Sequence, residues 1–355
     1  MTASPPLIKI GLMKRPTFQD VAREAQVGTA TVERVLNGRG GVKPELAARV
    51  LRAVKHLRYG IRQGLSHGVV RIELLVGQRH ADFHFELNRC FQQVAASLES
   101  SITLHRTFVR SGDIEDLAAY ISKPTFRRAG LILNAPRHPA IAESVRRIRQ
   151  QGVEVVQLLS KSVEQDVPVI AIDNYAAGRT AAYFASRMLA GQSGNFIALC
   201  HSNAFWDHVE RARGFSEYLS EETNQNHAFS RVISCEDDSF LTAQRLQHAL
   251  DEDDRIIGIY SIAPTRPIAS ILQRQRRKIF WVGHSLNEHT ASCVKSGLMD
   301  MVIDQLPELQ AQRAIQTVLF RLGLMDVEVS TDPVQFVTVT AQNLPPRFLR
   351  SRVAD

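Results

Sequence analysis

The sequence predicts an all-α head followed by an α/β body of two lobes with parallel, doubly wound sheets. Three short helical stretches lie within the first sixty residues. About ten apolar, strand-like runs then alternate with amphipathic stretches from residue 70 to residue 345. The net charge of +7 comes entirely from the head, because residues 1–67 hold twelve basic and four acidic residues. These three observations separate a small basic unit from a larger, nearly neutral one.

The head begins with Thr17-Phe-Gln-Asp20, a hydroxyl followed three residues later by a carboxylate, which is typical of a helix start. Gln26-Val27-Gly28 ends this helix, a second begins near Thr29, and Pro44 suits the first turn of a third. The apolar residues expected to face inward are Val32, Val35 and Leu36, then Val50, Leu51, Val54 and Leu57. Three short helices with a tight turn between the first two make a helix-turn-helix unit.

The body is predicted to contain repeated βα units. Its strand candidates are RIELLV, ITLHRTFV, AGLILN, VEVVQLL, VPVIAI, NFIALC, RVISC, IIGIYS, KIFWVG and MDMVID. Helical patterns between the runs predict parallel sheets with helices on both faces. So many strands exceed one sheet and indicate two similar halves.

Composition narrows the class of protein. No stretch approaches the roughly 20 apolar residues that cross a bilayer, and the N-terminus lacks the apolar core of a signal peptide. Four widely spaced cysteines indicate free thiols. We therefore expect a cytoplasmic protein with no membrane partner. A basic head on a neutral body is typical of nucleic-acid binding, although charge alone is equally compatible with a solvated basic face.

Catalytic and metal-binding patterns are not found. The sequence has no GxSxG, P-loop, HExxH or paired-carboxylate motif. His80 and His84 stand four residues apart without a further cluster of ligands. We expect neither an enzyme, nor a cofactor, nor a metal site.

The head resembles a known family. Residues 17–59 are similar, without a gap, to the DNA-binding domain of the LacI/GalR (lactose-repressor-like) family. The matching residues are Asp20, Val21, Ala22, Ala25, Val27, Thr31, Val32, Arg34, Val35, Asn37, Val42, Leu57 and Tyr59. The resemblance implies sequence-specific binding to double-stranded DNA.

The resemblance also assigns DNA contacts. The positions expected to face base edges in the major groove are Thr29, Ala30 and Arg34, and those expected to contact phosphates are Thr17, Thr31 and Asn37. Arg34 is suited to a bidentate contact with guanine, worth about 1–3 kcal/mol of discrimination. The alternative for Arg34 is an exposed helix charge.

The sequence departs from this family in two places. Gly28 and Glu33 stand where serine is usual, and Glu33 adds a negative charge beside the DNA. The connector GIRQGLSHG lacks the proline and alanine of the family's hinge helix, so Leu65 is the one candidate for its minor-groove wedge. Each glycine costs a helix about 1 kcal/mol relative to alanine. A plain flexible linker is the alternative to a hinge helix.

The body resembles, more weakly, the two-lobed fold of LacI-type effector domains and type I periplasmic sugar-binding proteins. That fold binds ligands between its lobes, at the carboxyl ends of strands. Arg211 in Arg-Ala-Arg-Gly-Phe and Gln305 in Asp-Gln-Leu-Pro match its ligand-facing positions. Asp82, Phe83 and Phe85 fall where aromatic and polar cleft residues lie. The alternatives are a surface salt bridge for Arg211 and core packing for the two phenylalanines.

Three ligand-binding positions depart from the family together. Arg137 lies in a loop where a carboxylate is usual, Ser261 replaces an asparagine, and Ser285 replaces an acid. Arg137 and Arg211 together are expected to clamp a carboxylate or phosphate. The pattern predicts an anionic effector, such as a sugar acid or a phosphorylated sugar. Loss of ligand binding is the alternative.

The sequence therefore predicts a transcriptional regulator, with repression favoured on family grounds. We expect a homodimer on a palindromic operator, controlled by a small sugar-like effector. The expected parts are a tail (1–14), the DNA-binding domain (15–59), a hinge or linker (60–69), the effector and dimerisation domain (70–345) and a second tail (346–355). A cytoplasmic sugar-binding protein is the remaining alternative.

Overall fold

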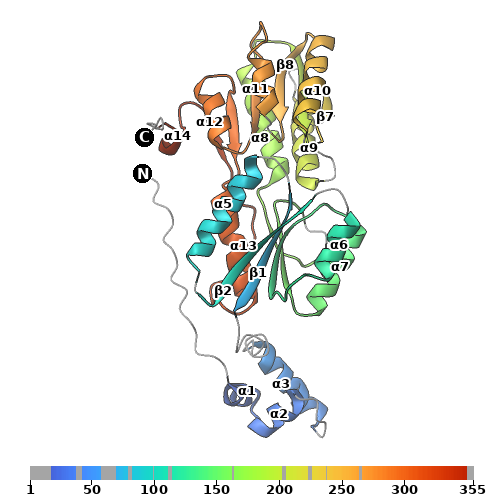
Figure 1. Ribbon diagram of the computed structural model, residues 1–355, viewed down its shortest axis with the longest axis vertical. Coiled ribbons are helices and arrows are strands. Elements are labelled where there is room, and N and C mark those ends of the chain that lie inside the picture. Colours follow the sequence, from blue (N-terminus) through green and yellow to red (C-terminus); the bar gives the residue numbers. More distant parts are fainter. Residues whose placement is uncertain are drawn as a thin grey trace.

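The computed structural model describes residues 17–36, 42–56, 69–78, 82–98, 100–110, 114–161, 164–201, 205–222, 226–236, 238–263 and 266–349. These residues form a helical head and a body of two lobes (Figure 1). Among them, no helix is long and apolar enough to cross a membrane.

The head consists of α1 (Phe18–Ala25), α2 (Thr29–Leu36) and α3 (Pro44–His56). The predicted cap of α1 is confirmed: the amide of Asp20 donates to the Thr17 hydroxyl, and the amide of Thr17 donates to the Asp20 carboxylate at 2.7 Å. The helices share one small core, formed by Val21, Ala22, Ala25, Val32, Val50 and Ala53. Val35 and Leu36 pack against it, so the predicted inward face of α2 is confirmed.

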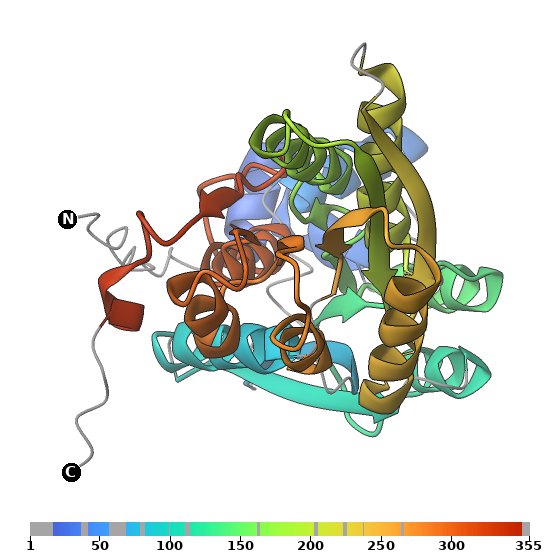
Figure 2. The same cartoon turned by 90° about the horizontal axis from the view of Figure 1, so that it is seen from above.

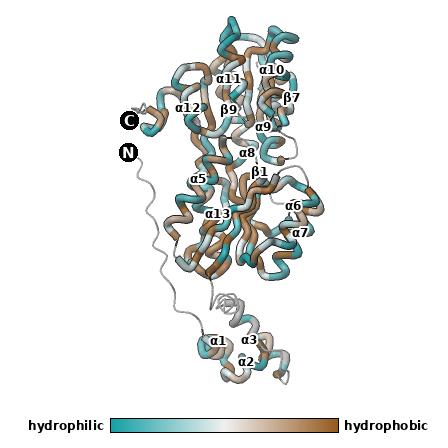
Figure 3. Tube along the Cα trace, viewed as in Figure 1, coloured by the Kyte–Doolittle hydropathy of each residue, from teal (hydrophilic) through white to brown (hydrophobic). Residues whose placement is uncertain are grey.

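The first lobe is built on a five-stranded parallel sheet in the order β2-β1-β3-β4-β5. Its strands are β1 (Val70–Gln78), β2 (Ile102–Arg110), β3 (Gly130–Asn134), β4 (Glu154–Leu158) and β5 (Val169–Ile170). Helices cover both faces. α5 (Asp82–Ala96) and α13 (Pro307–Arg321) share a core with Ile72 and Leu74, while α6 (Ile114–Ser122) and α7 (Pro139–Gln150) pack on Leu75. This alternation along β1 places the mostly brown strands of Figure 3 inside the lobe.

The second lobe has a six-stranded sheet in the order β11-β10-β9-β8-β6-β7. Its strands are β6 (Gly194–Cys200), β7 (His227–Ser234), β8 (Ile256–Ser261), β9 (Phe280–His284), β10 (Met301–Asp304) and β11 (Val337–Val339). One face packs on α8 (Asn174–Met188) and α9 (Trp206–Glu221). The other packs on α10 (Ser239–Glu252), α11 (Arg266–Leu272) and α12 (Glu288–Lys295), with α14 (Pro346–Leu349) beside α12.

All ten predicted strands are present in these two sheets, and the fold-class prediction is confirmed. The sequence did not predict β11, a three-residue strand that pairs antiparallel with β10. Its strand state depends on this neighbour, because three residues are too few for an alternating pattern. The view from above in Figure 2 shows the helices arranged around the strands.

Three described segments pass between the lobes. The first follows β5 and leads into α8, the second joins β10 to α13, and the third returns from α13 to β11. α13 packs on β3, β4 and β5 of the first lobe although it follows the strands of the second. The first and third segments are joined by a parallel bridge between Ile172 and Val334. The hinge of the body is therefore made of chain segments far apart in sequence.

Candidate functional site

The second helix of the head presents a polar outer face. Thr29, Ala30 and Arg34 are exposed, as is Glu33, while Val32 is buried. The predicted outward orientation of the three base-facing positions is therefore confirmed, and their contact with DNA stays a prediction. Thr31 is half-buried.

Of the residues predicted for the remaining DNA contacts, the structure describes one, Thr17. Asn37 and Leu65 lie outside the described residues. Thr17 is described, but its hydroxyl already donates to the Asp20 carboxylate at 2.8 Å as part of the α1 cap. A phosphate contact from that hydroxyl would have to replace this bond, so Thr17 has a structural role that the sequence comparison did not separate from DNA binding.

The angle between the first two helices is held by a residue from the third. Arg49 of α3 donates from Nη2 to the carbonyl oxygen of Gln26 at 3.1 Å and to its side-chain oxygen at 3.3 Å. Gln26 ends α1 with φ 52°, a left-handed conformation. Arg49 thus fixes the turn that sets the placement of α2, a role that its place in a basic run of the sequence did not indicate.

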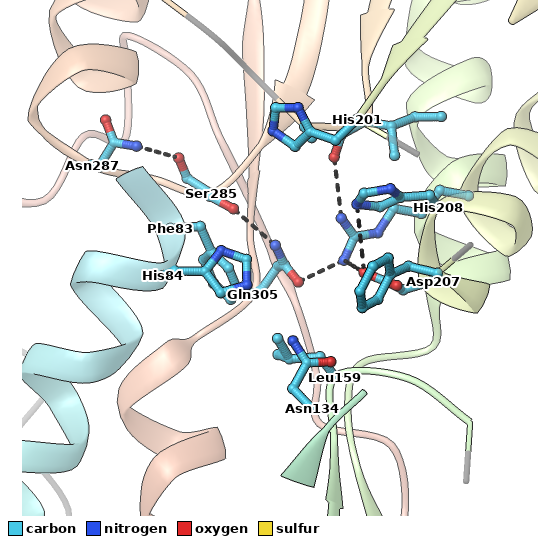
Figure 4. Close-up of a pocket in the computed structure, with 14 residues that line it drawn as sticks. Phe83, His84, Asn134, Leu159, His201, Asp207, His208, Ser285, Asn287 and Gln305 are labelled. Carbon is cyan, nitrogen blue, oxygen red and sulfur yellow. Dashed lines mark hydrogen bonds and ion pairs between the residues drawn. The ribbon is translucent and has the colours of Figure 1, made fainter. Parts of the chain in front are cut away.

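A cavity of about 520 Å³, counting the part open to solvent, lies between the lobes. Figure 4 shows Asn134 and Leu159 of the first lobe facing His201 and His208 of the second. Its lining residues are Phe83, His84, Asn134, Leu159, His201, Phe205, Asp207, His208, Arg211, Ile262, Ala263, Ser285, Asn287 and Gln305. Most of them follow the carboxyl ends of β1, β3, β4, β6, β8, β9 and β10, where parallel sheets place ligand sites.

The structure brings together four of the eight predicted cavity residues. Phe83, Arg211, Ser285 and Gln305 line the cavity. Asp82 is the first residue of α5, and its side chain lies outside the described part. Phe85 is corrected: it is 64% exposed and lies outside the lining, because residues two apart on a helix point in different directions.

Ser261 and Arg137 are also corrected. Ser261 is fully buried, and its hydroxyl accepts a hydrogen bond from Nε1 of Trp281 at 2.8 Å. The alternation along β8 turns it into the core, and Ile262 and Ala263 line the cavity instead. Arg137 is exposed, with its guanidinium 5.6 Å from the centre of the Trp206 ring, so it forms no clamp with Arg211 across the cavity.

Arg211 is the most enclosed cation of the cavity. Its side chain is 4% exposed, and each of its three guanidinium nitrogens donates a hydrogen bond. Nε donates to Oδ1 of Asn174 at 2.8 Å, Nη1 to the carbonyl of Ile262 at 3.2 Å and Nη2 to Oε1 of Gln305 at 2.7 Å. Burial lowers the pKa of Arg211, because removal from water penalises the charged form.

The network continues to Ser285. Nε2 of Gln305 donates to Oγ of Ser285 at 2.8 Å, a bond that Figure 4 marks beside the link from Gln305 to the arginine. Ser285 and Leu159 both have φ 70°, and Leu306, next to Gln305, has φ 50°. Left-handed backbone at non-glycine residues costs of order 1–3 kcal/mol each and clusters at functional sites. Strained backbone therefore lies on both sides of the cavity, at Leu159 in the first lobe and at Ser285 in the second.

The cavity is lined by one arginine, one carboxylate and three histidines. Three histidines, His84, His201 and His208, line it together with Arg211, against the single carboxylate of Asp207. An Asp207 oxygen lies 4.0 Å from Nη2 of Arg211 and 3.9 Å from Nε2 of His208. The formal charges of Arg211 and Asp207 therefore cancel, and the histidine rings add hydrogen-bonding groups to the wall.

One buried acceptor is left for a ligand. Oδ1 of Asn134, at the end of β3, has no hydrogen-bond partner among the described residues, and the side chain is 7% exposed. A buried acceptor without a partner costs about 1–3 kcal/mol, and a ligand hydroxyl would satisfy it. Asn134 was not predicted from the sequence, because the family resemblance pointed to the loop beyond the strand, where a carboxylate is usual and Arg137 stands here.

A buried pair of rings lies behind Arg211. The hydroxyl of Tyr260 is 2.6 Å from Nε2 of His284, and both residues are fully buried. Burial keeps the pKa of His284 well below its ordinary value and raises that of Tyr260. The pair is therefore neutral and adds no charge to the cavity. Within the described chain, no group of three or more His, Cys, Asp or Glu side chains is arranged to hold a metal ion.

Comparisons with known proteins agree with this architecture. Residues 17–60 match the bacterial regulatory proteins of the lacI family, and residues 125–322 match the periplasmic binding protein domain. The ribose operon repressor of Halalkalibacterium halodurans is 29% identical over 252 residues, covering 69% of this chain and 71% of the relative. Catabolite control protein A of Priestia megaterium is 26% identical over 213 residues, covering 58% and 61%.

Solved structures show the same fold for the body. A glucose-galactose binding protein from Geobacillus stearothermophilus aligns with a TM-score of 0.69 at 15% identity, covering 78% of this chain and 99% of that protein. A solute-binding protein from Burkholderia graminis, in complex with D-arabinose, aligns with a TM-score of 0.69 at 14% identity, covering 79% and 98%. At such identities the likeness concerns the fold alone.

Proposed function

Because the chain belongs to the periplasmic binding protein domain family and begins with a DNA-binding domain of the LacI family, we propose that it is a transcriptional repressor controlled by a small sugar-like effector. The observation that carries the proposal is the joining of two parts in one chain. A basic head exposes the outer face of α2, and a two-lobed body encloses a cavity at the ends of its strands.

The head supplies the DNA contacts. α2 enters the major groove with Arg34 at a guanine edge and Ala30 beside a thymine methyl group. Thr31 and Asn37 contact phosphates, which sets the position of the helix without reading sequence. The twelve basic residues of the first 67 attract the phosphate backbone, so affinity falls as salt concentration rises.

The body supplies the control. A sugar-like effector binds between the lobes, with Asn134 accepting from a hydroxyl and Arg211 beneath it. The descriptions of two similar proteins support a sugar. One relative is a ribose operon repressor, and one protein of the same fold was solved with D-arabinose. The effector changes operator affinity only to the extent that it binds one arrangement of the lobes more tightly than another.

Two copies of the chain act together. A homodimer formed through the body places two heads on a palindromic operator, because the symmetry of the dimer matches that of the half-sites. A regulator of transcription works where the DNA is, so we place this protein in the cytoplasm.

The test is selection of DNA from a random duplex library on the purified full chain. We expect a two-fold symmetric site with one fixed half-site spacing. Thermal unfolding of the same protein with ribose, arabinose, glucose and galactose, and with acids and phosphates of these sugars, then identifies the effector. Recovery of no preferred sequence, together with binding of a sugar, would instead establish a cytoplasmic sugar-binding protein.

A regulator that has lost ligand binding is the second candidate. The observation that favours it is the set of protein partners that Arg211 already has, because none of its nitrogens is left without a hydrogen bond. On this reading, no sugar or sugar derivative would change the affinity for the selected site.

A further inference from the structure

Arg211 is bonded to two of the segments that join the lobes. Asn174, which accepts from Nε of Arg211, begins α8 directly after the first segment, and its own amide donates to the carbonyl of Leu159 in the first lobe at 3.1 Å. Gln305, which accepts from Nη2, lies in the second segment between β10 and α13. A single side chain of α9 therefore connects both segments through the wall of the cavity.

The hydrogen bonds of Arg211 go to neutral acceptors, and its charge is balanced by a longer ion pair with Asp207. The three acceptors are two side-chain amides and one backbone carbonyl, all of them neutral. The nearest carboxylate oxygen, from Asp207, lies 4.0 Å away. The bond to Gln305 joins a cation to a neutral amide, whereas a carboxylate or phosphate adds opposite charge and can accept two parallel hydrogen bonds from the guanidinium, so an anion in the cavity is a better partner for Nη2 than Gln305.

Gln305 can give up the arginine without losing all support. Its Nε2 keeps the bond to Ser285, and its backbone carbonyl accepts from Nε2 of Gln310 at 2.8 Å. The next residue, Leu306, has a left-handed backbone. After loss of the bond to Arg211, the second segment would therefore still be anchored at its ends. The strained backbone between β10 and α13 would be free to change its conformation.

We propose that Gln305 takes the place of an anionic effector in the effector-free protein, and that a carboxylate or phosphate releases the second inter-lobe segment by taking Arg211 from Gln305. Effector binding and the arrangement of the lobes are then coupled, because the guanidinium of Arg211 can bond either to the effector or to Gln305 in the second inter-lobe segment. The inference rests on the proposed function, since it requires that the cavity holds the effector.

The cavity also defines the other end of this effector. Asn134, from the first lobe, offers a buried acceptor that has no partner in the part of the chain that the structure describes. It requires a hydroxyl or another donor, whereas Arg211, from the second lobe, requires an acid group. A hydroxylated carboxylate or phosphate meets both demands, so the structure supports a sugar acid or a sugar phosphate although Arg137 lies outside the cavity lining.

The test is calorimetric titration of the full chain with glucuronate and ribose 5-phosphate, with glucose and ribose as neutral controls. The two anions separate carboxylate from phosphate recognition. We expect Gln305→Ala to bind the preferred anion about 10-fold more tightly than the wild type, because a competing acceptor is removed. Gln305→Glu keeps a partner on Arg211, so it should fold normally and lose anion binding. Gln244→Ala, at an exposed glutamine of α10, is the matched control.

Three results would overturn the proposal. Weaker anion binding by Gln305→Ala would mean that Gln305 contacts the ligand directly, as an ordinary lining residue. If the wild type bound a neutral sugar more tightly than the acid or phosphate of that sugar, the proposal that the effector is an anion would be wrong. If neither anion bound the wild type or Gln305→Ala, the proposed competition between Gln305 and an anion for Arg211 would be wrong.

Operator affinity measured on the same samples separates this inference from the proposed function. Without ligand, Gln305→Ala should bind the operator as the anion-saturated wild type does, and added anion should not change it further. A wild type that binds its operator and responds to a neutral sugar keeps the proposed function and contradicts the inference. Absence of any sequence-specific DNA binding contradicts the proposed function itself.

Discussion

At the scale of single residues, two arginines show that the surroundings of a side chain decide its role. Arg34 stands exposed on α2, and among the described residues of the head no hydrogen bond holds its side chain. Arg211 has the same guanidinium but is buried among three acceptors. The first is arranged to read an external partner, and the second is arranged to exchange one partner for another.

Arg34→Ala should relax base choice at one position in each half-site. The loss of a bidentate contact is worth about 1–3 kcal/mol, so binding should weaken by roughly 10-fold to 100-fold for each half-site, with a smaller change on random DNA. Arg23→Ala is the control, because it removes the same charge from α1, where Arg23 pairs with Asp20 at 3.5 Å. Unchanged base preference in Arg34→Ala, measured by repeating the selection, would remove Arg34 from direct readout.

At the scale of elements, α8 and α9 approach each other through two glycines. A Cβ atom at Gly178 would lie 2.1 Å from the carbonyl oxygen of Arg211, and one at Gly214 would lie 2.1 Å from that of Tyr175. These distances are shorter than any real contact, so the helices could not pack this closely with larger residues. The close packing also places the backbone of Arg211 beside the first turns of α8, which follow the end of the first inter-lobe segment.

Gly178→Ala should therefore force α9 away from α8. Overpacking of this kind costs about 1–3 kcal/mol, and the displacement of Arg211 should weaken its bonds to Asn174 and Gln305. Urea unfolding should show the lost stability, and anion titration should show a changed affinity. Gly191→Ala is the control, because a Cβ there meets nothing within 4 Å. Equal stability of the two variants would show that the helices adjust without cost.

At the scale of the whole molecule, the second inter-lobe segment begins at a buried acid. Asp304 ends β10, is 7% exposed, and accepts from the amide of Leu306 at 3.2 Å. Glu86 of the first lobe and Arg347 of α14 both act on its charge. Burial outweighs the amide and Arg347, and it raises the pKa of Asp304 to about 6.

This raised pKa makes stability depend on pH. The ordinary value is 3.8, so between about pH 4 and pH 6 the folded state holds a proton that the unfolded chain has lost. The stabilisation from this group is complete below the unfolded pKa and is lost as pH rises through 6. Asp304→Asn stays neutral and still accepts from Leu306, so it should exceed the wild type in stability at pH 7.5, by at most about 3 kcal/mol.

Urea unfolding at pH 5 and pH 7.5 checks this prediction. The advantage of Asp304→Asn should shrink at pH 5, where the wild-type carboxyl is mostly protonated. The same substitution at the exposed Asp326 controls for the loss of one negative charge. A difference between Asp304→Asn and the wild type that is the same at both pH values would contradict it.

Most of the fold could be predicted because its signals are local. Eight of the ten predicted strands are runs whose apolar character follows from burial on both faces, the exceptions being the edge strands β2 and β7, and the α1 cap is made by residues three apart. The cavity could be predicted only in part. Phe83, Arg211, Ser285 and Gln305 were placed by family resemblance, whereas His84, Asn134 and His201 carry no pattern that separates them from other polar residues near strand ends.

The sequence by itself determined the division into a basic head and a two-lobed body, and the face that α2 exposes, because charge distribution and helical spacing are properties of neighbouring residues. Only the tertiary structure decided what the arginines do. Arg137 and Arg211 each follow a strand of a different sheet, and the sequence alone placed them together as a clamp. The packed lobes place Arg137 on the Trp206 ring and Arg211 between two inter-lobe segments, because position across a cavity depends on contacts between residues far apart in the chain.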